Sequence, residues 1–197
     1  MTRLSRIVLA SASPRRLELL RSLGLDVAVA PSGYDEPCLP SHSPAQLAQA
    51  HARAKLDAVA GEIVVAADTV VELDGEALGK PRDAADAVRM LRRLAGRDHR
   101  VHTAFALRIP ERAAPVEELS STTVRFYPLA DDEIAAYVAT GEPLDKAGAY
   151  GIQGRAAALV ESVEGDFYTV MGFPLGRFVR TLRRLGFLLP VAKASPP

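Results

Sequence analysis

The sequence predicts an α/β fold of the mixed α+β kind, in which helices flank a sheet with both parallel and antiparallel strands. Segments with apolar residues at helical spacing alternate with short apolar segments typical of strands. Asp74-Gly75 lies between two apolar runs and predicts a hairpin, so antiparallel pairing is expected too. A chain of 197 residues, 48% of them hydrophobic, is large enough for one domain or two closely packed lobes.

Apolar and alternating runs predict the strands. Residues 62–68 (EIVVAAD) are apolar at almost every position, which is typical of a strand buried on both faces, and this strand is expected to end at Asp68. Residues 100–109 instead alternate in the manner of a strand that pairs with an antiparallel neighbour. In chain order, strands are expected at residues 7–10, 62–68, 69–78 (a hairpin), 100–109, 121–128 and 157–166.

Capping residues predict the helices. Ser13 is a good N-cap for a helix that begins at Pro14, and Ser43 with Gln46 has the pattern of a capping box. Glycines follow the last turns of several helical segments and mark their ends. Helices are expected, in chain order, at residues 14–23, from residue 44 onward, at 84–95, at 132–139 and within 173–186.

Composition excludes several classes of function. Lys+Arg and Asp+Glu are both 24, so the net charge is zero and neither nucleic acid nor an anionic membrane is an expected partner. No apolar run is long enough to span a bilayer. A single cysteine, Cys38, excludes an intramolecular disulfide, and the N-terminus lacks a long apolar segment, so we expect a cytoplasmic protein.

Two arginines, Arg15 and Arg16, stand in the first turn of the first helix, where the partial positive charge of unpaired N–H groups disfavours cations. A polyphosphate would explain them, because N–H groups, the helix dipole and two guanidinium groups would hold it together. The alternative is that both side chains extend into solvent.

Two carboxylates and one lysine suggest phosphate chemistry. Asp68 at a strand end lies where open α/β sheets place ligands, although it equally suits a turn cap that bonds the N–H of Val70. Glu36 follows Asp35 in a loop and offers a ligand for Mg²⁺ if the loop folds against Asp68; otherwise it belongs to a solvated turn. Lys80 in GEALGKP fails the P-loop pattern, so it is a phosphate ligand on a turn or a solvated lysine.

The remaining polar candidates carry weaker signals. Gln153, in the glycine-rich segment GAYGIQG, has an amide that both donates and accepts at a base edge, although turn glycines are the simpler interpretation of that segment. The histidines lack metal-ligand spacing, and neither Cys38 nor any serine has a nucleophile motif, so a covalent hydrolase is not indicated.

Seven segments, in order, resemble the Maf family of nucleoside triphosphate pyrophosphatases, also called septum formation inhibitor proteins. They are LASASPRRLELL, DE at 35–36, ARAK at 52–55, AADTVV, LGKP, DKAGAYGIQG and GDFYTVMGFPL. The resemblance implies an elongated mixed sheet with flanking helices, similar to that of inosine triphosphatases, folded as one domain of two lobes around a cleft. It places that domain at residues 1–189 and implies a homodimer. The last residues, 190–197 (PVAKASPP), are expected to form a flexible tail.

The resemblance also implies a reaction and its residues. The family cleaves nucleoside triphosphates between the α and β phosphates with Mg²⁺ or Mn²⁺. By position, Asp68 matches the proton acceptor and a metal ligand, and Glu36 a second metal ligand. The positions that match substrate choice are Arg15, Thr69 and Gln153, and those that match further substrate contacts are Ser13, Arg16, Lys55 and Lys80.

The motifs SPRR and DKAGAYGIQG, with the pair Phe167 and Tyr168, resemble the branch that acts on dTTP and UTP. We therefore expect an enzyme that clears these and modified pyrimidine nucleotides from the nucleotide pool, with a role in cell division arrest. One alternative is the 7-methyl-GTP pyrophosphatase branch of the same family. Another is a nucleotide-binding regulator of septum formation without catalysis.

Overall fold

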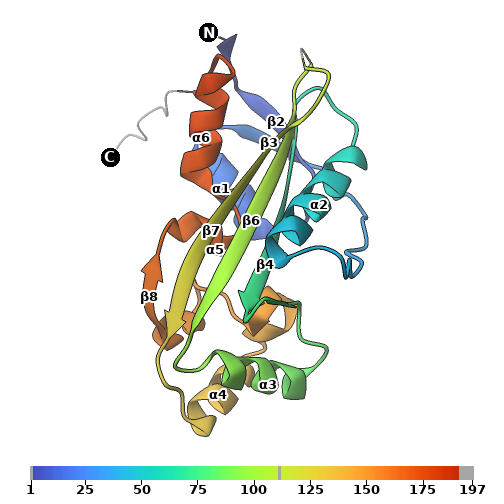
Figure 1. The fold of residues 1–197 in the computed structure, drawn as a ribbon. Helices are drawn as coiled ribbons and strands as arrows, with labels where there is room; N and C mark the ends of the chain where they lie inside the picture. Colours follow the sequence, from blue (N-terminus) through green and yellow to red (C-terminus); the bar gives the residue numbers. More distant parts are fainter. Residues whose placement is uncertain (1, 111, 191–197) are drawn as a thin grey trace, which may run out of the picture.

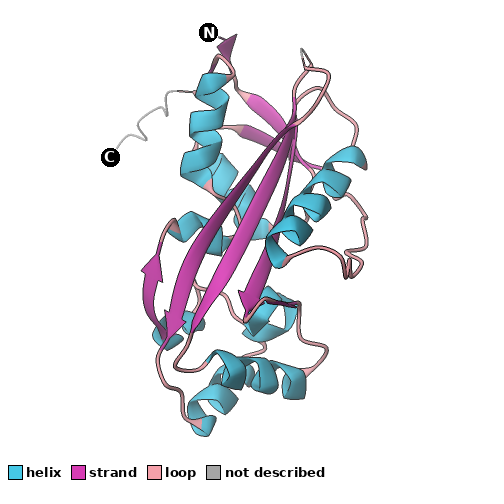
Figure 2. Ribbon diagram, in the orientation of Figure 1, coloured by secondary structure: helices cyan, strands magenta, loops and turns pink. Residues whose placement is uncertain are grey.

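The computed structural model describes residues 2–110 and 112–190, which form an elongated molecule built around one mixed sheet (Figures 1 and 2). The mixed α/β fold expected from the sequence is confirmed. The strands are β1 (Thr2–Arg3), β2 (Arg6–Leu9), β3 (Asp26–Val29), β4 (Val64–Leu73), β5 (Glu76–Leu78), β6 (Asp98–Arg108), β7 (Val116–Phe126), β8 (Val160–Glu164) and β9 (Phe187–Leu188). The helices are α1 (Pro14–Ser22), α2 (Pro44–Asp57), α3 (Ala84–Leu94), α4 (Asp131–Val138), α5 (Phe167–Met171) and α6 (Leu175–Arg184), with short 3-10 turns η1 (Glu142–Asp145), η2 (Ala147–Ala149) and η3 (Arg155–Leu159).

The main sheet has the strand order β3-β2-β4-β6-β7-β8, and β5 adds to β4. Strands β3, β2 and β4 are parallel, whereas β4, β6, β7 and β8 are antiparallel. The long strands β4, β6 and β7 run along the molecule, with α2 beside them and α3 and α4 at the end away from the two termini (Figure 1).

The edge of β4 that faces β2 is only partly covered. β6 lines the other edge from Val64 to Glu72, while β2 pairs with β4 only as far as Val65. β5 then joins that same edge from Val71 onward. Residues 66–70 therefore have a strand neighbour on one side alone.

This arrangement corrects one prediction about β4. The strand does not end at Asp68 but continues through it to Leu73, so Asp68 lies in the middle of a ten-residue strand. The continuation is stabilised by antiparallel pairing with β6, which extends without a break past Asp68 to the pair Glu72–Arg100. Strand β2 is the one that ends here, since its last residue, Leu9, pairs with Val65 and leaves Asp68 beyond its end.

Alternation along β4 separates two hydrophobic clusters. Val64, Ala66 and Val70 pack on one face against small residues of α2 such as Ala48 and Ala52. On the other face, Val65, Ala67 and Val71 belong to the larger core. The small side chains of α2 bring that helix close to the sheet, which places the residues of its last turn beside β4.

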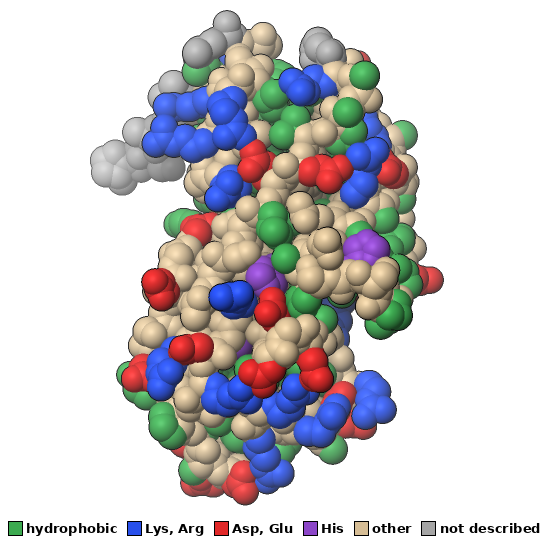
Figure 3. All heavy atoms as spheres, in the orientation of Figure 1, with side chains coloured by type: hydrophobic (Ala, Val, Ile, Leu, Met, Phe, Trp, Pro, Cys, Tyr) green, Lys and Arg blue, Asp and Glu red, His purple; other side chains and the backbone are tan. Residues whose placement is uncertain are grey.

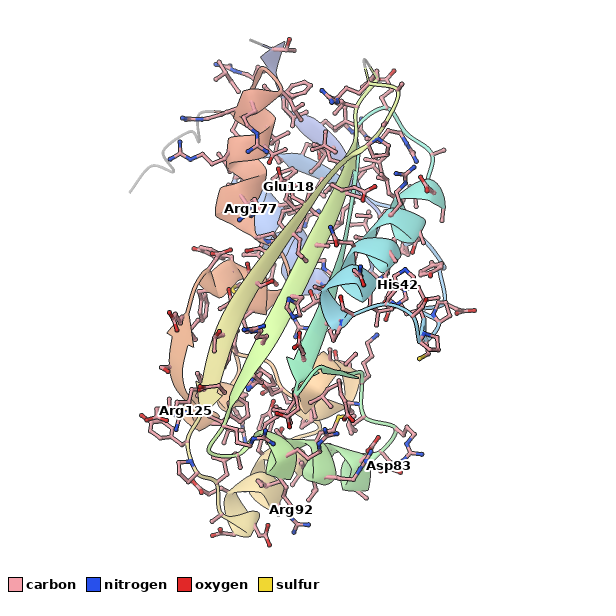
Figure 4. The ribbon with its side chains drawn as sticks, viewed as in Figure 1. His42, Asp83, Arg92, Glu118, Arg125 and Arg177 are labelled. Atoms are coloured by element: carbon pink, nitrogen blue, oxygen red, sulfur yellow. The ribbon has the colours of Figure 1, made fainter. Side chains whose placement is uncertain are left out.

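Helix α6 is attached to β7 by polar contacts around Glu118. Figure 4 shows Glu118 and Arg177 facing each other from the two elements. Arg177 Nη1 lies 3.3 Å from Glu118 Oε2, Thr181 Oγ1 donates to Oε1 at 3.0 Å, and Arg184 also donates to Oε1. This cluster orders the C-terminal helix against the sheet.

Local signals located the helices well, and the differences lie in short elements. Ser13 and Ser43 cap their helices as expected, and the reciprocal bond from Ser43 N to Gln46 Oε1 completes the capping box. β1, β3, β9, α5 and the 3-10 turns were not expected from the sequence, and η3 occupies the start of the strand expected at 157–166. Of the expected tail, residues 191–197 lie outside the described part of the chain.

Opposite charges are interspersed over much of the face shown in Figure 3. Among the ion pairs between elements, Arg92 of α3 lies 2.8 Å from Asp131 of α4. Among the helices within residues 2–110 and 112–190, none has the length and apolar character needed to cross a membrane.

Candidate active site

A cleft of about 780 Å³ opens beside the uncovered edge of β4. The first turn of α1, the loop before α2, the last turn of α2 and the turn after β5 all contribute to its walls. Five cationic side chains and three carboxylates line it, a local excess of two positive charges in a chain whose net charge is zero. The cleft is therefore suited to an anion that brings several negative charges.

At one side of the cleft, an ammonium group joins two carboxylates. Lys55 Nζ donates to Asp68 Oδ1 at 2.5 Å and to Glu36 Oε1 at 2.6 Å. Lys55 and Asp68 are only 7% and 4% exposed, whereas Glu36 is reached by solvent. The three residues come from α2, β4 and the loop before α2, and the close packing of α2 on the sheet brings them together.

Charges around Glu36 favour its ionised form. Burial opposes ionisation, but the hydrogen bond from Lys55 and the charges of Lys55, Lys80 and Arg16 outweigh it, so the pKa of Glu36 lies below its usual value. Glu36 is consequently a carboxylate at neutral pH.

The side chain of Arg16 extends from α1 to Thr69, on the face of β4 opposite the one that carries Asp68 and Lys55. Its Nη2 donates to Thr69 Oγ1 at 3.1 Å, its Nε to the carbonyl oxygen of Gly172 at 2.9 Å, and its Nη1 to Ser11 Oγ at 3.2 Å. Burial lowers the pKa of Arg16, and Asp68 and Glu36 partly oppose this shift. The planar donors of the guanidinium group are thereby fixed in the cleft wall.

A smaller inner pocket of about 60 Å³ adjoins the cleft and shares Thr69 and Arg16 with it. The residues that line this pocket but not the cleft include Val71, Val101 and Met171, and they come from β4, β6 and the segments around α5 and η2. Polar side chains that line both, such as Ser13, Arg15 and Lys146, complete its walls. A small pocket that combines apolar and polar groups suits a flat organic ring.

Comparison with known proteins assigns this chain to a family. The family model described as Maf-like protein matches residues 6–185. The chain belongs to the Maf family. The dTTP/UTP pyrophosphatase of Thermus thermophilus is 55% identical over 181 residues, which cover 92% of this chain and 95% of that protein. That of Symbiobacterium thermophilum is 51% identical over 189 residues, covering 93% and 96%.

A solved structure shares the fold of this Maf chain. The HAM1 protein from Coxiella burnetii superposes with a TM-score of 0.50 over 92% of this chain and 100% of that one. Its sequence identity is 17%, so the likeness concerns the fold alone.

Most of the predicted site residues lie in the walls of this one cleft. Its walls include Ser13, Arg15, Arg16, Glu36, Lys55, Asp68, Thr69 and Lys80. Gln153 is different, because it lies exposed in the turn from Gly151 to Gly154 and belongs to neither the cleft wall nor the inner pocket.

Lys146, which was not predicted as a site residue, lines both the cleft and the inner pocket. Its Nζ donates to the carbonyl oxygen of Glu142 and to Asp145 Oδ1, both at 2.6 Å. A Cβ at Gly151 would lie 2.6 Å from Lys146 Cε, so the glycine leaves room for the lysine stem. Both residues belong to the segment DKAGAYGIQG, in which the glycines and the glutamine, and not the lysine, carried the sequence signal.

The donor set suits a cation that arrives with a phosphate. Within residues 2–110 and 112–190 there is no group of three or more His, Cys, Asp or Glu side chains able to hold a metal ion. Mg²⁺ in phosphate sites commonly uses one or two carboxylates and completes its shell with phosphate oxygens and water. Glu36 and Asp68, which already share one cation in Lys55, match that requirement.

Proposed function

We propose that this Maf protein hydrolyses dTTP and UTP to the nucleoside monophosphate and pyrophosphate. The observation that carries the proposal is the group formed by Asp68, Lys55 and Glu36 in a cleft with excess positive charge. The Maf relatives named dTTP/UTP pyrophosphatase, about half identical over nearly their whole length, support the choice of substrate.

In this proposal Asp68 is the proton acceptor. Its Oδ1 is bonded to Lys55, so Oδ2 is the oxygen available to accept a proton from water. The water oxygen attacks the α phosphorus, the bond to the bridging oxygen breaks, and pyrophosphate leaves. Lys55 orients the carboxylate throughout, and its own position is set by the last turn of α2.

The cations of the cleft hold the triphosphate. Arg16 is fixed by its contacts to Ser11, Thr69 and Gly172, while Lys80 on the turn after β5 is exposed and able to move toward the ligand. Fixed positive groups stabilise the charge that develops on the phosphoryl oxygens and on the leaving pyrophosphate. Arg15 and Ser13 at the start of α1 complete the phosphate wall, where backbone N–H groups also favour anions.

Glu36 and Asp68 would hold the divalent cation, Mg²⁺ or Mn²⁺. Such an ion, when bound, neutralises phosphate charge and polarises the phosphoryl group. Thr69 and Arg15 at the junction of cleft and inner pocket are the proposed residues of substrate choice. Gln153 would join them only if its turn moves toward the ligand.

We also propose that residues 1–189 act as one catalytic domain, that the protein is a homodimer, and that it acts on the cytoplasmic nucleotide pool. Light scattering on the purified protein measures the oligomeric state directly.

The test of the reaction is a substrate panel. Purified protein is incubated with Mg²⁺ and dTTP, UTP, CTP, 5-methyl-UTP, GTP or 7-methyl-GTP, and pyrophosphate is quantified separately from orthophosphate. Pyrophosphate from dTTP and UTP supports the proposal. Turnover of 7-methyl-GTP alone would contradict the assignment of the base, and binding without any pyrophosphate would favour a regulatory protein.

A further inference from the structure

A chain of hydroxyl groups runs from the inner pocket into the sheet. Thr69 on β4 and Thr103 on β6 are directly opposite each other in the antiparallel register, and their Oγ1 atoms lie 3.0 Å apart. Thr103 Oγ1 also lies 2.7 Å from the carbonyl oxygen of Thr169 in α5. Thr103 is fully buried, so water does not compete for its hydroxyl group.

The second contact fixes the direction of the first. A carbonyl oxygen only accepts, so Thr103 must donate its single hydroxyl proton to Thr169. Thr103 then has no proton for Thr69, and the bond between the two hydroxyls requires Thr69 as the donor. The proton of Thr69 therefore points into the sheet and away from the pocket.

Arg16 restricts Thr69 further. A guanidinium group only donates, and Arg16 Nη2 at 3.1 Å occupies one of the two lone pairs of Thr69 Oγ1. The remaining lone pair is the only hydrogen-bonding capacity that Thr69 retains for a ligand, and it accepts. Gly172 keeps the approach open, because a Cβ there would lie 3.5 Å from Thr69 Oγ1.

We propose that Thr103 is a positioning residue that makes Thr69 an obligatory acceptor, and that Thr69 thereby selects bases with an N–H donor at N3. This inference rests on the proposed function. Uracil and thymine carry a proton on N3, whereas N3 of cytosine is itself an acceptor and would face a lone pair of Thr69. A site that hydrogen-bonds one group of its substrate discriminates against the analogue that lacks it, because a buried polar group is left unpaired. The small inner pocket suits a single ring.

The test compares kcat/KM for UTP and CTP in four proteins. Wild type must first release pyrophosphate from UTP, so a failure of the proposed function is recognised before any variant is measured. Thr103→Val keeps the shape but frees the Thr69 proton to turn toward the pocket, and Thr103→Ser restores the hydroxyl group. Thr122→Val is the matched control, since Thr122 is a buried threonine that donates to a carbonyl oxygen of the same segment, Asp166 O, at 3.0 Å.

We expect Thr103→Val to reduce the wild-type preference for UTP over CTP about tenfold, the effect of one hydrogen bond. Thr103→Ser and Thr122→Val should keep the preference within about twofold of wild type. If Thr103 had a purely structural role, Thr103→Val would lower kcat/KM for UTP and for CTP in parallel and leave their ratio unchanged. That result would overturn the inference. A wild-type ratio near one would overturn it as well.

A second measurement does not depend on folding of a variant. UTP methylated at N3 lacks the donor, so wild type should hydrolyse it at least about tenfold less efficiently than UTP. Equal kcat/KM for the two nucleotides would show that no acceptor in the site forms a hydrogen bond with N3.

Discussion

Asp68 and Thr69 are neighbours in β4, but their side chains lie on opposite faces of the sheet. Asp68 contacts Lys55 of α2, and Thr69 contacts Arg16 of α1. An intact sheet would keep these two groups apart. Because β2 pairs with β4 only as far as Val65 and β5 pairs with it only from Val71 onward, the edge of β4 is open between these positions, and one ligand can contact groups from both faces.

Replacing Asp68 with asparagine tests the proposed proton acceptor. Asparagine keeps an oxygen for Lys55 but cannot accept a proton from water, so we expect kcat for UTP to fall about 10²- to 10⁴-fold. Nucleotide binding measured by calorimetry should remain detectable. A variant within tenfold of wild-type turnover would exclude Asp68 as the base.

Replacing Arg16 with lysine tests the fixed guanidinium group. A lysine cannot reproduce the separate bonds to Gly172 O, Ser11 and Thr69, so the cation loses its fixed position. We expect kcat/KM for UTP to decrease about 10- to 100-fold in steady-state assays. Arg21→Lys in the exposed last turn of the same helix is the control and should match wild type.

Signals contained within a few residues were read correctly from the sequence. The cap of α1 by Ser13 and the capping box of Ser43 with Gln46 involve residues three apart, and the structure has both. The hairpin at Asp74-Gly75 is equally local: both residues have positive φ, 54° and 82°, as a tight hairpin turn requires.

Features that depend on distant segments were not predictable in the same way. The extension of β4 beyond Asp68 follows from its pairing with β6, in which the partner of Asp68 is Ala104, far along the chain. The contact of Lys55 with both Glu36 and Asp68 needs three separate segments to pack. The five-residue helix α5 did have a local signal, because Asp166 accepts from the N–H groups of Tyr168 and Thr169, but it is too short to show helical periodicity.

Gly148→Ala should destabilise the protein for two reasons. The residue has a positive φ of 68°, and an added Cβ would lie 3.0 Å from the side chain of Val71 on β4. We expect the free energy of unfolding in urea to fall by about 2–3 kcal/mol. Gly75→Ala is the matched control. Gly75 also has a positive φ, but nothing lies within 4 Å of an added Cβ. This variant should lower the free energy of unfolding by about 1 kcal/mol. Equal losses in both variants would show that the contact with Val71 is relaxed at no cost.

Glu118 should make the attachment of α6 sensitive to acid. Partial burial opposes its ionised form, but hydrogen bonds from Thr181, Arg184 and Arg177 outweigh this, and its pKa lies below the ordinary 4.5. A lowered carboxyl pKa means that the stabilisation is complete above pH 4.5 and is lost as the pH falls through the lower value in the folded protein.

Glu118→Gln should therefore lower the free energy of unfolding by about 1 kcal/mol at pH 7, and the difference from wild type should shrink toward pH 3. Thermal unfolding followed by circular dichroism across this range measures it. The control is Glu161→Gln, which removes an exposed partner of Arg125 and should change stability by less than about 0.5 kcal/mol. A pH-independent difference would assign the effect of Glu118→Gln to packing.

The first and last strands of the fold are partners of each other. Thr2–Arg3 of β1 pairs in parallel with Phe187–Leu188 of β9, and the backbone of Leu4 continues the contact by donating to Leu188 O. Removing either strand takes away the hydrogen-bonding partner of the other. A truncation that deletes β1 therefore also destabilises the pairing of β9. Because β1 and β9 lie side by side, a linker could also connect these two strands while new termini are opened in a surface loop, as in a circular permutation.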